Sequence, residues 1–319
     1  MREGQFIRKN IRKWKSYQYD KADGPDEIAS RFTELINDLG YAKTFYPHSK
    51  VTQYLNGLAS TIYLGIYKNK REKNARFTHF WKTELPLTVR KYHRELLYAF
   101  LIFMGFTILA VFSTSQDQGF IRGVLGDNYV DMTEENILKG DPFGVYKDDD
   151  RLQMFLTIAL NNIKVSFMVF VGGFLLSIGT IWALFNNGVM LGAFHALFFM
   201  HDLGAKSILV VWIHGTLEIS AIIIAGGAGL IVGNSILFPH TLSRLQSLKR
   251  GAKDGLKLMI GLVPVFIVAG FLEGFITRYS TMPMAISISI LLFSFLFIVW
   301  YFIIYPIQIQ KRTATLQSS

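Results

Sequence analysis

The stretch that decides the fold runs from Ile208 to Gly233 and reads ILVVWIHGTLEISAIIIAGGAGLIVG. About 20 apolar residues in a row are enough to cross the hydrocarbon core of a bilayer as a helix. Within this run stand His214 and Glu218, whose ionisable side chains are costly in lipid. Residues four apart share one face of a helix, so both side chains point the same way. The stretch therefore predicts a membrane-spanning helix and indicates a candidate polar site inside it.

The composition of the whole chain indicates a membrane protein. Of its 319 residues, 51% are hydrophobic and 18% are charged, and its formal net charge is +10. Most basic residues flank apolar runs, which favours an anionic membrane surface over nucleic acid as the partner of this charge. The absence of cysteine excludes disulfides, thiolate nucleophiles and cysteine-based metal sites. The basic start, Met1–Lys15, has no apolar segment behind it, so we do not expect a cleaved signal peptide.

Six apolar segments predict an all-helical, polytopic membrane protein. The third segment, Gly188–Met200, rises only about 20 Å as a helix, against about 30 Å of hydrocarbon. Whether it crosses the bilayer therefore stays open at this stage. The predicted spans are Leu96–Phe112, Val165–Phe185, Gly188–Met200, Ile208–Gly233, Leu256–Phe271 and Ala285–Tyr305.

The placement of lysine and arginine predicts the orientation of these spans. Basic residues gather before the first span, between the fourth and fifth, and after the last, whereas the segment after the first span is acidic. Six crossings put all three basic regions on one side, which the positive-inside rule makes cytoplasmic, together with both termini. We expect a cytoplasmic helical region at 1–95, a transmembrane domain at 96–312 with an extracytoplasmic acidic loop at 113–164, and a disordered cytoplasmic tail at 313–319.

The N-terminal region has its own helical pattern. Apolar spacing predicts one helix from Pro25 to about Gly40 and a second after Pro47. Trp14, which stands among basic residues, suits either the lipid headgroup layer or a solvated basic arm.

Several predicted spans carry polar side chains in the outer half of the membrane. Polar residues at one depth on separate helices indicate a shared centre, because lipid offers them no partners. The predicted intramembrane polar cluster contains His214, Glu218, Glu273, Asn162 and Lys164, with Asn161, His195, His201 and Asn187 as secondary members.

Two interpretations of this cluster remain open from the residues alone. It is either a ligand, metal or proton site, or a polar knot whose interhelical hydrogen bonds contribute about 0.6 kcal/mol each. Lys164 is the natural charge partner for either glutamate. A catalytic zinc normally needs three protein ligands, and His201 or Glu273 could join His214 and Glu218. The spacing does not require a metal, and the absence of phosphate-binding or dinucleotide motifs predicts no cofactor.

Small residues recur four apart, as Gly188/Gly192, Gly229/Gly233 and Gly270/Gly274. Such pairs let helices approach closely. Packing within one protomer is favoured over a homo-oligomer seam, which stays open.

The order and spacing of several motifs resemble the stage II sporulation protein M family over nearly the whole chain. The resemblance rests on HGTLE at 214–218, GGAGL at 226–230, Pro239, GLVP at 261–264 and EGFIT at 273–277. It extends to Asn161-Asn162, Asn187-Gly188, Trp14 and Phe45-Tyr46-Pro47.

This resemblance implies an integral protein of the bacterial inner membrane. It also implies a non-enzymatic scaffold or partner subunit of an envelope complex, linked to cell-wall remodelling, with protein partners besides the lipid bilayer. The acidic insertion at about 113–151 exceeds what a minimal member needs and is a candidate docking surface. The alternatives are a transporter or channel for a small solute that uses the His/Glu cluster, and an intramembrane hydrolase that uses His214 and Glu218 as acid and base.

Overall fold

The computed structural model describes the chain except residues 21, 23, 68–72, 143–150, 278–281 and 319. The described residues are helical and contain no strand, as predicted. The chain divides into two compact units, Met1–Arg76 and Phe77–Ser319, each with its own apolar core. The acidic Asp148–Asp150 of the predicted loop and the basic Lys68, Lys70, Arg71 and Arg278 lie outside the described residues.

The N-terminal unit contains three packed helices, α1 (Glu3–Tyr19), α2 (Pro25–Phe45) and α3 (Lys50–Tyr67). Trp14 of α1 is fully buried, and its Nε1 donates a 2.8 Å hydrogen bond to Asp38 of α2. Both settings predicted for Trp14, lipid headgroups and solvent, are therefore wrong. The reason is that the apolar stripes of α2 and α3 need a third helix to cover them.

Helix α2 also continues beyond the stop predicted at Gly40 and ends at Phe45. A glycine inside a helix costs about 1 kcal/mol relative to alanine. Burial of Leu39 and Ala42 on either side of Gly40 outweighs that cost, since both side chains belong to the core of the unit.

The second unit carries six helices that are long and apolar enough to cross a membrane. Their number agrees with the prediction, and the chain is a multi-pass membrane protein. The candidate spans are α6 (His93–Gln116), α9 (Arg151–Val171) with the 3-10 turn η3 (Gly172–Phe174), α10 (Ile178–Met200), α11 (Gly204–Leu237), α12 (Arg244–Phe271) with the π-helix η4 (Leu272–Thr277), and α13 (Met284–Val299) continuing through the π-helix η5 (Trp300–Ile304) into α14 (Tyr305–Ser318).

The second and third spans differ from the prediction. The predicted span Val165–Phe185 is wrong, because the chain reverses within it, and α10 is a full-length helix of 23 residues. Leu176 and Ser177 make the reversal with φ angles of 54° and 69°. No proline or charge marks this turn, and the apolar run continues through it. Packing fixes it instead, since a Cβ on Gly173 would collide with the backbone of Gly229 on α11.

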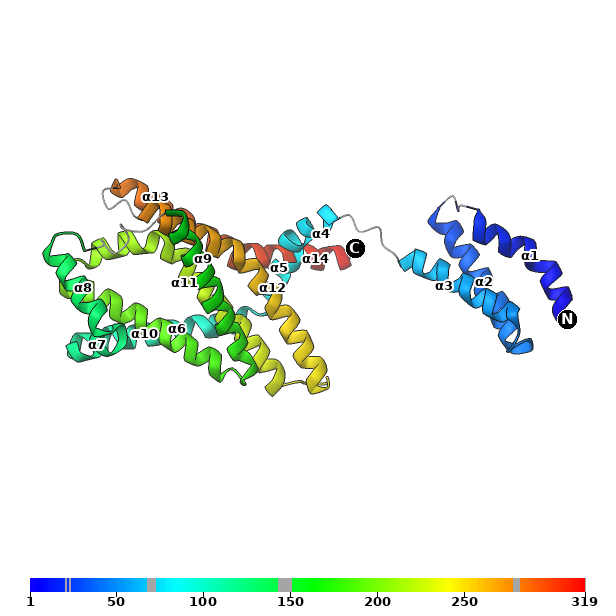
Figure 1. The fold of residues 1–319 in the computed structure, drawn as a ribbon, viewed down its shortest axis with the longest axis horizontal. Helices are drawn as coiled ribbons and strands as arrows, with labels where there is room; N and C mark the ends of the chain where they lie inside the picture. The colour runs from blue at the N-terminus through cyan, green and yellow to red at the C-terminus, as the bar shows by residue number, and fades with distance from the viewer. Residues whose placement is uncertain (21, 23, 68–72, 143–150, 278–281, 319) are drawn as a thin grey trace. The chain divides into compact units, whose positions relative to one another are not determined.

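Helix α11 is the centre of this unit. It packs against α6, α9, α10, α12 and α13, and every residue from Ala221 to Gly233 is buried. The small residues of this stretch allow the close approach of its neighbours. The helix that the sequence singles out is thus the one around which the others gather (Figure 1).

The glycine pairs pack against other helices of the same chain. Gly188 and Gly192 face α6, Gly229 and Gly233 face the α9–α10 turn and the start of α10, and Gly270 and Gly274 face α9. These three faces therefore pack the protomer, and a homo-oligomer would have to use another surface.

A short helical hairpin lies within the predicted acidic loop, at one end of the second unit (Figure 1). It comprises α7 (Gln118–Leu125) and α8 (Asp127–Leu138), joined at Gly126 with φ of 86°. Ile121 and Val130 pack against Leu197 of α10. Arg122 pairs with three acidic residues, most closely with Asp131 at 2.6 Å. Much of the segment expected to be a loop is therefore an ordered cap on α10.

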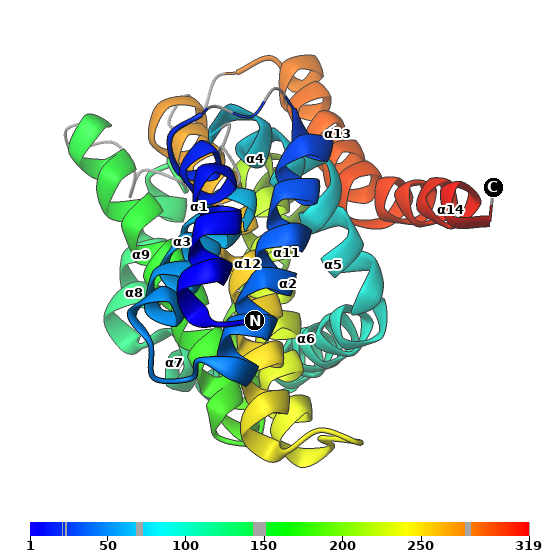
Figure 2. The ribbon, with the colours of Figure 1, turned by 90° about the vertical axis from the view of Figure 1, so that its right-hand side faces the viewer.

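The chain before α6 is helical, and its part at 85–91 packs against α12, η5 and α14. It contains α4 (Lys73–His79), the π-helix η1 (Phe80–Glu84) and α5 (Leu85–Lys91). Lys91 forms a 2.6 Å ion pair with Asp254 of α12, and the Tyr301 hydroxyl donates to the carbonyl of Trp81. The segment 313–319, expected to be disordered, is helical as far as Ser318, and α14 points away from the α11–α12 pair (Figure 2).

Candidate functional site

Two elements position the ionisable side chains of the candidate site. α11 presents His214 and Glu218 one turn apart on one face. The π-helix η4, which continues α12, presents Glu273 and Thr277. A π-helical turn has a wider i→i+5 spacing and frequently marks a functional site. Here its wider turn brings both side chains of η4 to α11.

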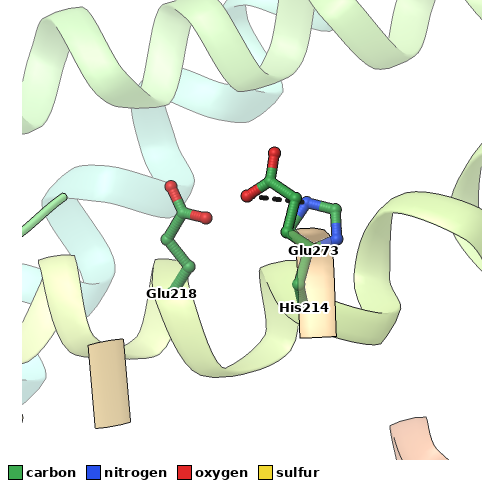
Figure 3. Close-up of side chains that lie close together, drawn as sticks. All are labelled: His214, Glu218 and Glu273. Atoms are coloured by element: carbon green, nitrogen blue, oxygen red, sulfur yellow. Dashed lines mark ion pairs between the residues drawn. The ribbon is translucent and has the colours of Figure 1, made fainter. Parts of the chain in front are cut away.

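His214, Glu218 and Glu273 converge on one point. Their potential ligand atoms all lie within 4.8 Å of one another. His214 Nε2 lies 3.8 Å from a carboxylate oxygen of Glu273 (dashed line in Figure 3), and the Glu218 carboxyl projects from the same side of α11 as the imidazole. The side chains are withdrawn from solvent, with His214 5% and Glu273 9% exposed.

Thr277 fixes the imidazole of His214. Nδ1 of His214 lies 3.0 Å from the Thr277 hydroxyl, and that hydroxyl donates its only proton to the carbonyl of Leu272 at 3.2 Å. With the hydroxyl proton directed to Leu272, the hydroxyl accepts from His214, and this hydrogen-bond network assigns the ring proton to Nδ1. Nε2 is left as a lone pair that faces the carboxyl of Glu273.

Asn162 of α9 completes the polar surroundings. It is 7% exposed, and its Nδ2 has no hydrogen-bond partner among the described residues. Its amide interacts with the Glu218 carboxyl without reaching it in a well-formed hydrogen bond. A buried donor without a partner costs about 1–3 kcal/mol. The polar centre therefore retains unused hydrogen-bonding capacity.

A cavity of about 370 Å³ lies directly beside these side chains. Spans α10 and α11 provide most of its wall, and the α7–α8 hairpin lines it with Val124, Leu125 and Tyr129. Burial raises the pKa of Tyr129, so its phenol stays protonated at neutral pH. His214, Glu218, Glu273 and the half-buried Asn187 supply the polar part of the lining.

Lys164 and Asn161 do not join the cluster. Both are exposed, and Lys164, predicted as the charge partner of the glutamates, makes no ion pair with them. The physical reason is helical phase. A step of two residues along an α-helix rotates the side-chain direction by about 200°. Lys164 therefore lies away from the face of α9 that buries Asn162. The candidate span begins at Arg151 and not at the predicted Val165, so Asn161, Asn162 and Lys164 lie within it and do not precede it.

The other histidines of the prediction have separate positions. His195 accepts a 3.0 Å hydrogen bond from Trp212 Nε1 and also contacts Ser207, so it ties α10 to the start of α11. His201 is exposed in the turn between these helices. Of the two candidates for a third metal ligand, Glu273 is therefore present at the cluster and His201 is not.

The sequence prediction missed Thr277 and the lining provided by α7 and α8. Thr277 stands four residues after Glu273, the same spacing that links His214 to Glu218, and this repetition was the available signal. Nothing in the local sequence indicates that Leu125 and Tyr129 fold back over a cavity. The arrangement as built can bind a cation, hydrogen-bond a small polar solute or pass a proton between its side chains.

Comparison with known proteins gives four findings, of which the first three are as follows. Over 139 residues the chain is 29% identical to the uncharacterized protein MJ0706 of Methanocaldococcus jannaschii. The match covers 41% of this chain and 58% of that protein, so the chain spans little more than half of the relative's length. No solved structure matches the chain. Residues 4–68 match a domain family of unknown function, which coincides with the three N-terminal helices.

The sequence match of the second unit identifies the family. Residues 99–278, which run from within α6 to the end of η4 and include His214, Glu218 and Glu273, match the sequence model of stage II sporulation protein M. That segment covers more than half of the 319 residues. The chain belongs to the stage II sporulation protein M family.

Proposed function

We propose that this membrane protein binds a small hydrophilic solute or ion in the cavity under α7 and α8, as part of a transporter or channel. The observation that carries this proposal is the incomplete satisfaction of the polar groups around the cavity. Asn162 Nδ2 has no partner among the described residues, and neither Glu218 nor Glu273 is paired with a lysine or arginine there.

The energetics favour a binding site over a polar knot. A hydrogen bond between membrane helices contributes about 0.6 kcal/mol on average. One unpaired buried donor costs about 1–3 kcal/mol. A cluster kept only to join helices would be expected to satisfy its members, whereas a binding site leaves donors and acceptors free for its ligand. The cluster also lies near the middle of α11 and beside the π-helical turn η4, and such turns are frequent at functional sites.

The charge distribution supports an orientation for this proposal. Acidic side chains are frequent on the α7–α8 hairpin, whereas Arg244, Lys249 and Arg250 lie at the start of α12, at the other ends of the spans. The positive-inside rule then gives a cavity on the extracytoplasmic side and cytoplasmic termini. A bacterial inner membrane is the location that fits the family.

Thiol labelling tests whether the cavity admits water. The chain has no cysteine, so single substitutions carry no background. Val211→Cys lines the cavity, whereas Leu109→Cys lies 59% exposed on α6, where lipid would cover it. In sealed vesicles, a membrane-impermeant thiol reagent should label Val211→Cys from the α7–α8 side only and leave Leu109→Cys unlabelled. Failure to label Val211→Cys from either side would refute the proposal.

A second candidate is a membrane partner subunit of an envelope complex. The observation that favours it is the separate N-terminal unit, which exposes large apolar side chains: Phe45 is 59% exposed and Leu64 63%. Such side chains suit a protein interface or a membrane surface. Purification from native membranes should then yield a complex of fixed stoichiometry that Leu64→Ser weakens, whereas a stable protein that migrates alone would contradict this role.

A further inference from the structure

The proposed site contains two carboxylates and one imidazole around a single point, and this set defines a ligand class. We propose that His214, Glu218 and Glu273 bind one divalent transition-metal cation, such as Zn²⁺, Mn²⁺ or Fe²⁺. The inference rests on the proposed function, because it names the ligand of that same cavity.

Geometry is the first argument. Bonds of about 2.1 Å to a tetrahedral metal separate neighbouring ligand atoms by about 3.4 Å. The His214–Glu273 separation of 3.8 Å is close to this value, and the three ligand atoms lie within 4.8 Å of one another. A small change of the Glu218 side-chain torsions therefore completes a three-ligand site, and the adjoining cavity leaves room for water as a fourth ligand.

The second argument is the orientation of His214. Metal-bound histidines usually donate their other ring N–H to a hydrogen-bond acceptor, which fixes the ring and its tautomer. Thr277 provides such an acceptor at 3.0 Å, while its own proton is held by the carbonyl of Leu272. Nε2, which this tautomer leaves unprotonated, consequently faces the Glu273 carboxyl (dashed line in Figure 3).

Charge balance is the third argument. Two ionised carboxylates in a low-dielectric interior need compensation. No lysine or arginine among the described residues pairs with Glu218 or Glu273, and Lys164 is exposed on another face of α9. When both carboxyls are ionised, a divalent cation matches their combined charge of −2. The Nδ2 of the buried Asn162, which makes no well-formed hydrogen bond among the described residues, lies near the Glu218 carboxyl and can hold it or a metal-bound water.

The chemical types of the three ligand atoms narrow the choice of cation. Imidazole nitrogen suits zinc, iron, nickel and copper, whereas sites for magnesium and calcium are built from oxygen alone. The carboxylates disfavour soft copper(I), which selects sulfur ligands. A mixed nitrogen and oxygen site therefore favours the divalent transition metals over the alkaline earths.

Titration of the purified full-length protein with Co²⁺, a visible-absorbing stand-in for Zn²⁺, tests the proposal. After removal of metal by a chelator, we expect one Co²⁺ per chain, displaced by Zn²⁺ but not by an equal concentration of Mg²⁺. Glu218→Gln and Glu273→Gln should each weaken binding by at least about a hundredfold, since loss of a direct ligand should exceed the roughly 10–100-fold effect of losing a supporting contact. Lys164→Gln and His201→Gln, outside the cluster, should bind like the unchanged protein.

Two results would overturn the metal assignment: no Co²⁺ or Zn²⁺ binding by the unchanged protein, or binding that His201→Gln removes and Glu218→Gln does not. Thermal unfolding of each metal-free variant checks that it is folded. Should either Gln variant fail to fold, a rise in the melting temperature of the unchanged protein with Zn²⁺ decides the question, because a ligand of the native state stabilises it. Val211→Cys labelling separates the failures: a labelled cavity without metal binding rejects the cation alone, whereas an unlabelled cavity rejects the proposed function.

Discussion

The Nδ1 atom of His214 on α11 lies 3.0 Å from the hydroxyl of Thr277 on η4, although the two residues are 63 positions apart in the chain. Because the hydroxyl donates to the carbonyl of Leu272, this contact determines which ring nitrogen of His214 faces the two glutamates. The relationship links the π-helical geometry of η4 to the chemistry available in the cavity.

Replacement of Thr277 tests this link. Thr277→Val keeps the shape of the side chain but removes the acceptor for Nδ1–H, so we expect cobalt affinity to fall about 10–100-fold. Thr277→Ser restores the hydroxyl and should restore most of the affinity, as measured by the same titration. Equal affinities in the valine and serine variants would show that the hydroxyl does not position His214 for metal.

Metal binding should weaken as pH falls. Ligands bind metal in their deprotonated forms, so protons compete with the cation for His214, Glu218 and Glu273. We expect a lower cobalt affinity at pH 5.5 than at pH 7.5, with protons released on binding. Tyr129 does not contribute to this change, because burial raises its already high pKa. A binding constant that is the same at both pH values would contradict competition at these side chains.

Gly173 should be intolerant of any side chain. Its added Cβ would meet the backbone of Gly229, which no rotamer change can move. Overpacking of this kind typically costs about 1–3 kcal/mol. Gly173→Ala should therefore lower the melting temperature in detergent, whereas Gly105→Ala on α6, where a Cβ meets nothing within 4 Å, should leave it nearly unchanged. Equal melting temperatures would show that the α9–α10 turn does not depend on this contact.

Trp14 should be essential to the N-terminal unit. Removal of a fully buried tryptophan costs about 3–5 kcal/mol, and Trp14→Ala also removes the indole donor to Asp38, which keeps its ion pair with Lys13. Limited proteolysis of the full-length variant should cut α1 and α2 faster than in the unchanged protein. Tyr19→Ala, a substitution at a side chain 75% exposed, serves as the matched control. Unchanged cleavage in Trp14→Ala would contradict a core role.

Topology can be measured with the same cysteine-free background. Leu138→Cys at the end of α8 and Lys249→Cys near the start of α12 both present exposed positions. An impermeant reagent should reach them from opposite sides of the membrane. Labelling of both from one side would contradict the proposed orientation and an odd number of crossings between them.

Hydropathy was enough to predict the number of spans and the central position of the 208–233 run. It could not predict the reversal at Leu176 and Ser177, because a turn within lipid-facing apolar residues leaves no polar signal and depends on contact with Gly229. The unknown helical phase of α9 limited the prediction of the site in the same way. The i,i+4 spacing pairs His214 with Glu218, but the face of α9 that meets them depends on where that helix begins.

The role of Trp14 and the cavity lining required the tertiary structure. Basic neighbours made Trp14 look suited to a membrane surface, yet the core of the first unit buries it. The acidic character of the segment after α6 obscured Leu125 and Tyr129, whose apolar surfaces turn inward over the cavity. In both cases the decisive interaction is with a residue distant in sequence.

The most direct test of the central claim is the X-ray absorption spectrum of the zinc-loaded, full-length protein. We predict a first shell of nitrogen and oxygen at about 2.0–2.2 Å, with the scattering of one imidazole that His214→Gln abolishes. A shell with two or more imidazoles, or one that persists unchanged in His214→Gln, would show that His214, Glu218 and Glu273 are not the metal ligands.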